Sequence, residues 1–216
     1  MSTPSTPQAT AAPVIFGSTD SGEELARAEL YGLLASLWLA PPDADLLRQF
    51  KTAVTEAPEA GAWLQEPWQG LVGALRQTSL EAAAAEHHAL FQGVGKPEIF
   101  AYGSFYLSGY LNEKPLANLR TDLVALGLTR DDSTFETEDH VAYLFEVMRY
   151  LIAGDDMAVC NLEQQRRFFR AHIQTWVEQL CDNVISNPRA QVWRALAVFT
   201  QQFVRVETQG FDMLEA

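Results

Sequence analysis

The sequence has few cysteines and no spacing that would join them into a site. Cys160 and Cys181 are the only two in 216 residues, and no Cys-x-x-Cys pair is present. This excludes a disulfide framework of the kind found in small secreted proteins, and also a cysteine-rich zinc site. We expect both thiols to be reduced and either buried or idle, as in a cytoplasmic protein.

Cationic side chains are also scarce. The chain has 15 Lys and Arg against 28 Asp and Glu, a net charge of −13 and a pI near 4.6. Its densest basic site, Arg166 and Arg167 with Arg170, fits one solvated helix face rather than a phosphate-binding stripe. Because nucleic-acid binding depends on clustered Lys and Arg, we expect no nucleic-acid partner.

No hydrophobic run is long enough to span a bilayer. The longest, residues 30–40, is interrupted by Gly32 and Ser36 and falls far short of the roughly 20 residues that a membrane helix needs. The N-terminus lacks the basic region of a secretory signal. The sequence therefore predicts a cytoplasmic protein without membrane insertion.

Sustained period-two alternation is missing as well, whereas helical spacing recurs along the chain. This predicts an all-α protein with a single globular domain of roughly seven to nine helices over residues 19–216. Residues 1–18, rich in Ser, Thr, Pro and Ala, are predicted to be a disordered tail. Helices are expected over residues 20–39, from 43 to near 58, over 68–76, 79–91, 115–126, from 137 or 138 to 153, over 157–181, and after Asn187-Pro188. Residues 100–110 fit either a helix or an irregular aromatic segment.

Two stretches stand out as candidates for a site. Residues 86–106 run from the end of an Ala-rich helix, through a Gly- and Pro-broken loop, into a cluster of aromatics. Residues 136–140 (Glu-Thr-Glu-Asp-His) open an apolar helix. We expect the two stretches to face each other and to form a binding groove. Acids in a first helical turn also stabilise the helix dipole, so Glu136, Glu138 and Asp139 have a purely structural explanation too.

Enzyme chemistry is poorly supported by the same residues. Glu86, His87, His88 and His140 invite a metal-dependent enzyme, but the paired Glu-x-x-His motifs of a di-iron bundle and the His-x-x-x-His zinc spacing are absent. A hydrolase built on Ser104 with His140 lacks the Gly-x-Ser-x-Gly elbow. We therefore expect no catalysis and no cofactor, and keep the metal site as the weaker alternative.

Several ordered blocks resemble the TorD/DmsD family of chaperones, which mature bacterial molybdenum redox enzymes. The resemblance covers nearly everything after about residue 22, and the opening segment from Leu30-Tyr31 to Pro42 fits it. Its blocks are Leu90-Phe91-Gln92-Gly93, Tyr102-Gly103-Ser104-Phe105-Tyr106, Glu136-Thr137-Glu138-Asp139-His140, Phe168-Phe169 with His172 and Trp176, and Trp193-Arg194-Ala195-Leu196. Thr137 replaces a proline of the family signature, and Ala101 stands where some members have proline.

The resemblance implies a non-enzymatic chaperone. It implies binding of the twin-arginine signal peptide on the apo catalytic subunit of a molybdoenzyme, which is held until its cofactor is inserted. Carried over by position, the peptide site comprises Tyr102, Ser104, Tyr106, Glu136, Asp139 and His140.

The residue chemistry agrees with this reading. Glu136, Glu138 and Asp139 suit the guanidinium groups of two arginines, while Phe91, Phe100 and Phe105 suit the apolar stretch that follows them. An all-α adaptor for some other partner helix is the alternative. The client enzyme, contact with the molybdenum cofactor or a guanine nucleotide, and a choice between monomer and homodimer (with helix exchange about residues 127–135) all stay open.

Overall fold

The computed structural model describes residues 20–52, 64–93, 95–131 and 134–213. The predicted disordered tail, residues 1–18, lies outside these ranges. Within them the chain is all helical apart from loops and one isolated β-bridge, which confirms the predicted fold class. The described ranges contain ten helices: α1 (Asp20–Leu39), α2 (Ala44–Thr52), α3 (Gln65–Gln77), α4 (Leu80–Phe91), α5 (Gly103–Ser108), α6 (Lys114–Ala125), α7 (Val141–Ala153), α8 (Leu162–His172), α9 (Val177–Ser186) and α10 (Val192–Met213).

Several helix ends follow from the local sequence. Asp43 caps α2 by accepting a hydrogen bond from the Leu46 amide at 2.8 Å, and the Ser79 hydroxyl caps α4 by accepting one from Ala82 at 3.2 Å. Gly127 follows α6 with φ of +72°, a left-handed conformation that glycine adopts without steric cost. These starts and stops agree with the predicted ones.

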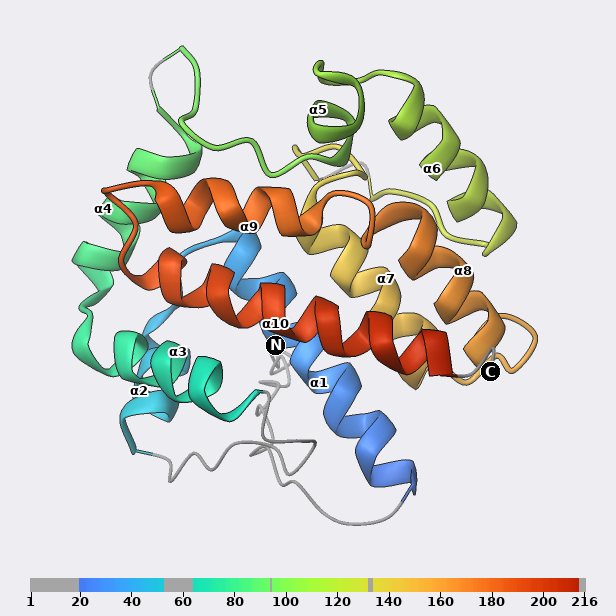
Figure 1. The fold of residues 1–216 in the computed structure, drawn as a ribbon, viewed down its shortest axis with the longest axis horizontal. Coiled ribbons are helices and arrows are strands. Elements are labelled where there is room, and N and C mark those ends of the chain that lie inside the picture. The colour runs from blue at the N-terminus through green and yellow to red at the C-terminus, as the bar shows by residue number, and fades with distance from the viewer. Residues whose placement is uncertain (1–19, 53–63, 94, 132–133, 214–216) are drawn as a thin grey trace, which may run out of the picture.

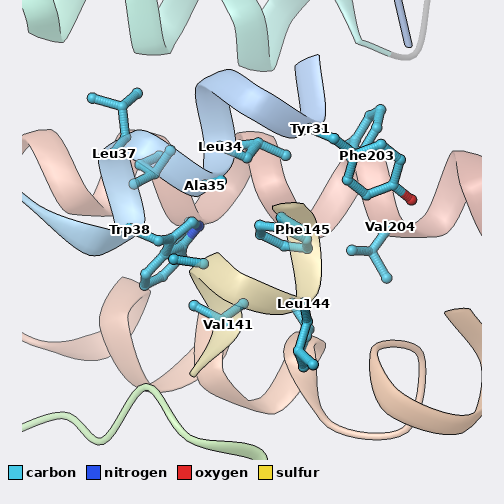
Figure 2. Packing of buried hydrophobic residues seen from close by; sticks show 14 of the residues in the cluster. Tyr31, Leu34, Ala35, Leu37, Trp38, Val141, Leu144, Phe145, Phe203 and Val204 are labelled. Atoms are coloured by element: carbon cyan, nitrogen blue, oxygen red, sulfur yellow. The ribbon is translucent and has the colours of Figure 1, made fainter. Parts of the chain in front are cut away.

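The core forms where α1, α7 and α10 meet. α1 packs along α7, and α10 packs against α9 and α3. Figure 2 shows Tyr31 of α1 beside Phe203 of α10, while Trp38, also on α1, lies nearer to Val141 of α7. Tyr31 meets Phe203 edge-on at a ring-centroid distance of 4.9 Å. The buried side chains of these three helices form the centre of the hydrophobic core.

The predicted helix over residues 157–181 is wrong, because the chain turns between α8 and α9. The amides of Ile173 and Gln174 both donate to the Phe169 carbonyl at 2.9 Å, which ends α8. The Trp176 indole then donates to the His172 carbonyl at 2.6 Å. The break places Trp176 under α5, where its indole lies 3.1 Å from the position a Cβ on Gly103 would take. A straight helix would not bring this ring to α5.

The start of α7 also differs from the prediction. The helix begins at Val141 rather than at Thr137 or Glu138, and His140 is its N-cap. Glu136, Glu138 and Asp139 therefore precede the helix and are not acids of its first turn. The dipole explanation for these acids is wrong, and they must be accounted for by other contacts.

In Figure 1, α9 and α10 cross the middle of the molecule, while α5 and α6 lie together at its upper right edge. α6 packs against α5 and buries Leu116, Leu119 and Leu123. No helix in the described ranges has the length and apolar character to cross a membrane. The α5–α6 edge is where the two predicted stretches meet.

Candidate functional site

The aromatic block and the acidic block lie side by side. Tyr102 and His140 form an isolated antiparallel β-bridge. The Gly103 amide donates to the Asp139 carbonyl, and the Val141 amide donates to the Ala101 carbonyl, both at 2.9 Å. This confirms the prediction that the two stretches face each other, although the paired residues are 36 to 40 positions apart in the chain.

The Asp139 side chain stabilises the contact between the two stretches. Its carboxylate accepts a hydrogen bond from the Ser104 amide at 2.8 Å and so caps α5 from a distant part of the chain. The other carboxylate oxygen accepts a bond from the Thr137 hydroxyl at 2.6 Å. Asp139 is 3% exposed and Ser104 is fully buried. Thr137, at the position of the family proline, thus holds Asp139 by a hydrogen bond that proline lacks.

His140 is equally enclosed. Its Nδ1 accepts a hydrogen bond from the Ala142 amide at 3.2 Å, and its ring meets Tyr102 edge-on at 5.1 Å. Burial lowers the pKa of His140 to about 4, against the opposing pull of the charges on Glu136 and Asp139. The ring is therefore neutral at pH 7 and serves as a helix cap rather than as a cation.

Glu136 is a half-buried carboxylate of the acidic block. The Tyr102 hydroxyl donates to it, and both residues are half-buried. Burial and the bond to Glu136 raise the pKa of Tyr102 above its usual range, so the phenol stays protonated. Arg130 donates at 3.4 Å to the Glu136 main-chain carbonyl, not to its carboxylate. The carboxylate thus keeps acceptor capacity for an outside donor.

Glu138 already has a cationic partner. Arg120 of α6 donates to its two carboxylate oxygens at 3.0 and 2.9 Å. Partial burial works to raise the pKa of Glu138, but the bonds and charge of Arg120, with the charge of Arg130, leave it lowered. Arg120 lies 18 residues before Glu138 in the chain, and no sequence motif at that spacing points to it.

The aromatic residues form two stacked pairs, one between Phe100 and Phe105 and one between Tyr106 and the buried Trp176. Phe100 and Phe105 stack at a centroid distance of 4.3 Å and are both half-buried. Tyr106 stacks on Trp176 at 5.3 Å, and its hydroxyl accepts a bond from Asn183 at 3.2 Å. Trp176 is buried in the core, and its ring also positions Tyr106.

Phe91 does not join these aromatics. Its ring contacts are with Trp38, His87 and Trp193, at centroid distances of 6.1, 5.1 and 6.1 Å. No ring contact in the described part of the chain links it to Phe100 or Phe105. Phe91 therefore does not pack with those two rings as expected for a shared apolar groove. It contacts core residues from its position at the end of α4.

Two surface pockets lie outside the predicted site. One, of about 460 Å³, opens between α5, α6 and α8 and is lined by residues that include Leu107, Asp122 and His172. The other, of about 340 Å³, lies between α2 and the start of α4. His172 is half-buried and bonds to Asp122 at 2.8 Å, as a histidine at the edge of the core can. Neither pocket lies between the two predicted stretches.

The residues of the metal-site alternative are engaged elsewhere. The Glu86 carboxylate caps α10 by accepting hydrogen bonds from the amides of Gln191, Val192 and Trp193 at 2.7, 3.1 and 3.0 Å. His87 is buried, and burial lowers its pKa to about 4. Within the described ranges no group of three His, Cys, Asp or Glu side chains is arranged to hold a metal ion.

Comparisons with known proteins agree with the helical architecture and the block pattern. A family model described as nitrate reductase delta subunit matches residues 57–182. The chaperone protein TorD of Vibrio cholerae serotype O1 is 24% identical over 204 residues, covering 87% of this chain and 93% of TorD. TorD of Colwellia psychrerythraea is 24% identical over 224 residues, covering 88% and 93%.

A solved structure shares the fold. The crystal structure described as that of a redox enzyme maturation protein from Archaeoglobus fulgidus has a TM-score of 0.55 and 18% sequence identity. The similarity covers 90% of this chain and 99% of that one. At this identity the likeness supports the fold alone.

Proposed function

The chain belongs to the nitrate reductase delta subunit family, a TorD/DmsD-like family of redox enzyme maturation chaperones, and on this premise we propose that it binds a twin-arginine signal peptide. The peptide belongs to the apo catalytic subunit of a molybdoenzyme, which the chaperone holds in the cytoplasm until its cofactor is inserted. The TorD relatives are chaperones, in agreement with the prediction of a non-enzymatic protein.

The observation that carries this proposal is the Tyr102–His140 bridge. It joins the acidic turn to the aromatic block, where the Tyr102 hydroxyl bonds the half-buried Glu136 and where Phe100 and Phe105 stack a few residues to either side of Tyr102. A signal peptide with two adjacent arginines and a following apolar stretch needs those two kinds of surface next to each other. The net charge of −13 also favours encounter with a cationic peptide.

The site residues have different roles in this proposal. Glu136 and Glu138 receive guanidinium groups, and Tyr102, Phe100 and Phe105 contact the peptide beside them. Ser104, Asp139 and His140 are buried and hold the two stretches together, so they position the site rather than touch the ligand. Tyr106 and Trp176 support α5 from below. Phe91 supports the core behind the site.

The test is a titration of the full chain with a synthetic peptide that carries two adjacent arginines before an apolar stretch, followed by calorimetry. Its twin-lysine version should bind more weakly, because an ammonium group cannot form two parallel bonds to a carboxylate. Glu136→Gln should weaken binding of the twin-arginine peptide about tenfold or more, as expected when a hydrogen bond to a charged group is lost.

Glu163→Gln is the matched control. It removes one negative charge from the first turn of α8, where Glu163 pairs only with Arg166 of its own helix among the ion pairs described. Its affinity for the peptide should equal that of the wild type. If the wild type binds neither peptide while an unrelated amphipathic helix binds, the chain is an adaptor for another partner, and the proposed function is wrong.

A further inference from the structure

Arg120 occupies one of the two carboxylates proposed to receive peptide arginines. Its guanidinium reaches from the middle of α6 to Glu138 and bonds each carboxylate oxygen separately, at 3.0 and 2.9 Å. The Arg120 side chain is 52% exposed, whereas that of Glu138 is 14% exposed. The acceptor is thus partly enclosed, while the donor stands mostly in water.

This geometry demonstrates what Glu138 can bind. In this arrangement two nitrogens of one guanidinium bond two oxygens of one carboxylate. Arginine can form it and lysine cannot, because lysine has a single nitrogen. Glu138 is also only two residues from Glu136, in the turn that leads to His140. The two acids therefore offer adjacent acceptors to a ligand with adjacent arginines, and the chain's own arginine already fills one of them.

We propose that Arg120 is an intramolecular competitor, which occupies the guanidinium site of Glu138 in the free protein and yields it to one arginine of the bound peptide. The inference rests on the proposed function and adds to it an exchange of one arginine for another. The competing contact makes Glu138 selective, because only a ligand group that forms the same two bonds can replace Arg120 on equal terms.

The exchange needs little rearrangement. An exposed side chain can rotate into water without moving α6, which stays held by its three buried leucines. Exposed ion pairs are weak, so the contact with Arg120 is readily given up. Once the first peptide arginine is bound at Glu136, the second is presented to Glu138 at a high effective concentration.

Affinity measurements on Arg120→Gln test the competition. With Arg120 removed, the twin-arginine peptide should bind about twofold to fivefold more tightly, the range expected when an exposed ion pair no longer has to be broken. The twin-lysine peptide should gain less. In a Glu138→Gln background, Arg120→Gln should bring no tightening, since the carboxylate for which the arginines compete is gone.

Arg205→Gln is the matched control for charge. Arg205 is 47% exposed and pairs with Glu178 through two nitrogens at 3.0 and 2.7 Å, away from the site residues. It makes the same change in net charge and should leave affinity unchanged. If Arg120→Gln binds the peptide no better than Arg205→Gln, or if its gain persists without Glu138, the inference is overturned while the peptide-binding function stands. A wild type that binds neither peptide overturns both.

Discussion

Two arginine–glutamate pairs in this molecule have similar geometry but different surroundings. In the core, Arg27 of α1 bonds Glu207 of α10 at distances from 2.7 to 2.9 Å, and the Tyr31 hydroxyl adds a third donor at 2.7 Å. At the α5–α6 edge, Arg120 bonds the two carboxylate oxygens of Glu138 at 3.0 and 2.9 Å. The side chains of the core pair are 17% and 8% exposed, against 52% and 14% at the edge.

The comparison separates a structural ion pair from an exchangeable one. Inside the protein, removing one partner leaves the other charged and without water, so the contact is fixed once the chain has folded. At the surface, water replaces a lost partner at little cost. The same pair of side chains can therefore clamp two helices in one place and act as a replaceable contact in the other.

The largest effect is expected from breaking the core pair. Glu207→Gln should lower the free energy of unfolding by about 3–5 kcal/mol, because it removes the buried charge that holds the enclosed Arg27 guanidinium and leaves the exposed Glu24 as its counter-charge. Urea unfolding followed by circular dichroism measures this directly. Glu178→Gln, which removes an exposed partner of Arg205, is the control and should cost less than about 1 kcal/mol. Equal losses in the two variants would show that burial does not distinguish the pairs.

The next effect concerns acid. Burial lowers the pKa of His87 to about 4 from its usual 6.5, so the folded state resists protonation that the unfolded chain accepts. Stability is complete above pH 6.5 and falls as the pH drops toward 4, by roughly 3 kcal/mol for this histidine. His140 adds a loss of the same sign over the same window.

Replacing His87 by phenylalanine tests this. The ring lies among Phe91 and Trp193, so an aromatic substitute keeps the packing while removing the titrating group. The variant should lose about 3 kcal/mol less than the wild type between pH 7 and pH 4, measured from urea unfolding at each pH. His88→Gln is the comparison: the charge of His88 contributes less than burial to lowering the pKa of His87, so this variant should keep most of the pH dependence. A wild-type curve and a His87→Phe curve of the same slope would contradict the assignment.

A smaller effect should separate the two kinds of helix cap. Asp139→Ala leaves the buried Ser104 amide and the Thr137 hydroxyl without their acceptor, and should cost about 2 kcal/mol. Asp43→Ala removes a cap that is local to α2 and exposed, and should cost about 1 kcal/mol. Hydrogen exchange of α5 should quicken in the Asp139 variant and stay unchanged in the Asp43 variant.

These caps show what the sequence could and could not predict. Asp43 and Ser79 lie three residues before the amides they cap, so spacing alone revealed them. Glu86 and Asp139 cap helices about 105 and 35 residues away in the chain, and no local pattern reports such a contact. The sequence therefore revealed the acids at 136–139 only by their charge. Their hydrogen-bond partners are known from the folded structure.

The family blocks filled part of that gap. They predicted that the stretch around Tyr102 and the stretch around His140 belong to one site, and the bridge between the two residues confirms their proximity. The break before Trp176 escaped prediction, because apolar residues on either side keep helical spacing through it. The spacing of apolar residues shows which face of a helix is buried. It does not show a break in the helix when the residues after the break keep the same spacing.

The smallest effect is expected at the exchangeable pair itself. Arg120→Gln should change the free energy of unfolding by no more than about 1 kcal/mol, since Arg120 stands mostly in water, Glu138 keeps partial access to it, and α6 keeps its buried leucines. The measurement is again urea unfolding, with Arg205→Gln alongside it. A loss as large as that of Glu207→Gln would mean that Arg120 clamps α6 to the acidic turn. In that case the contact would be structural, and an incoming arginine could not displace it without unfolding the edge of the molecule.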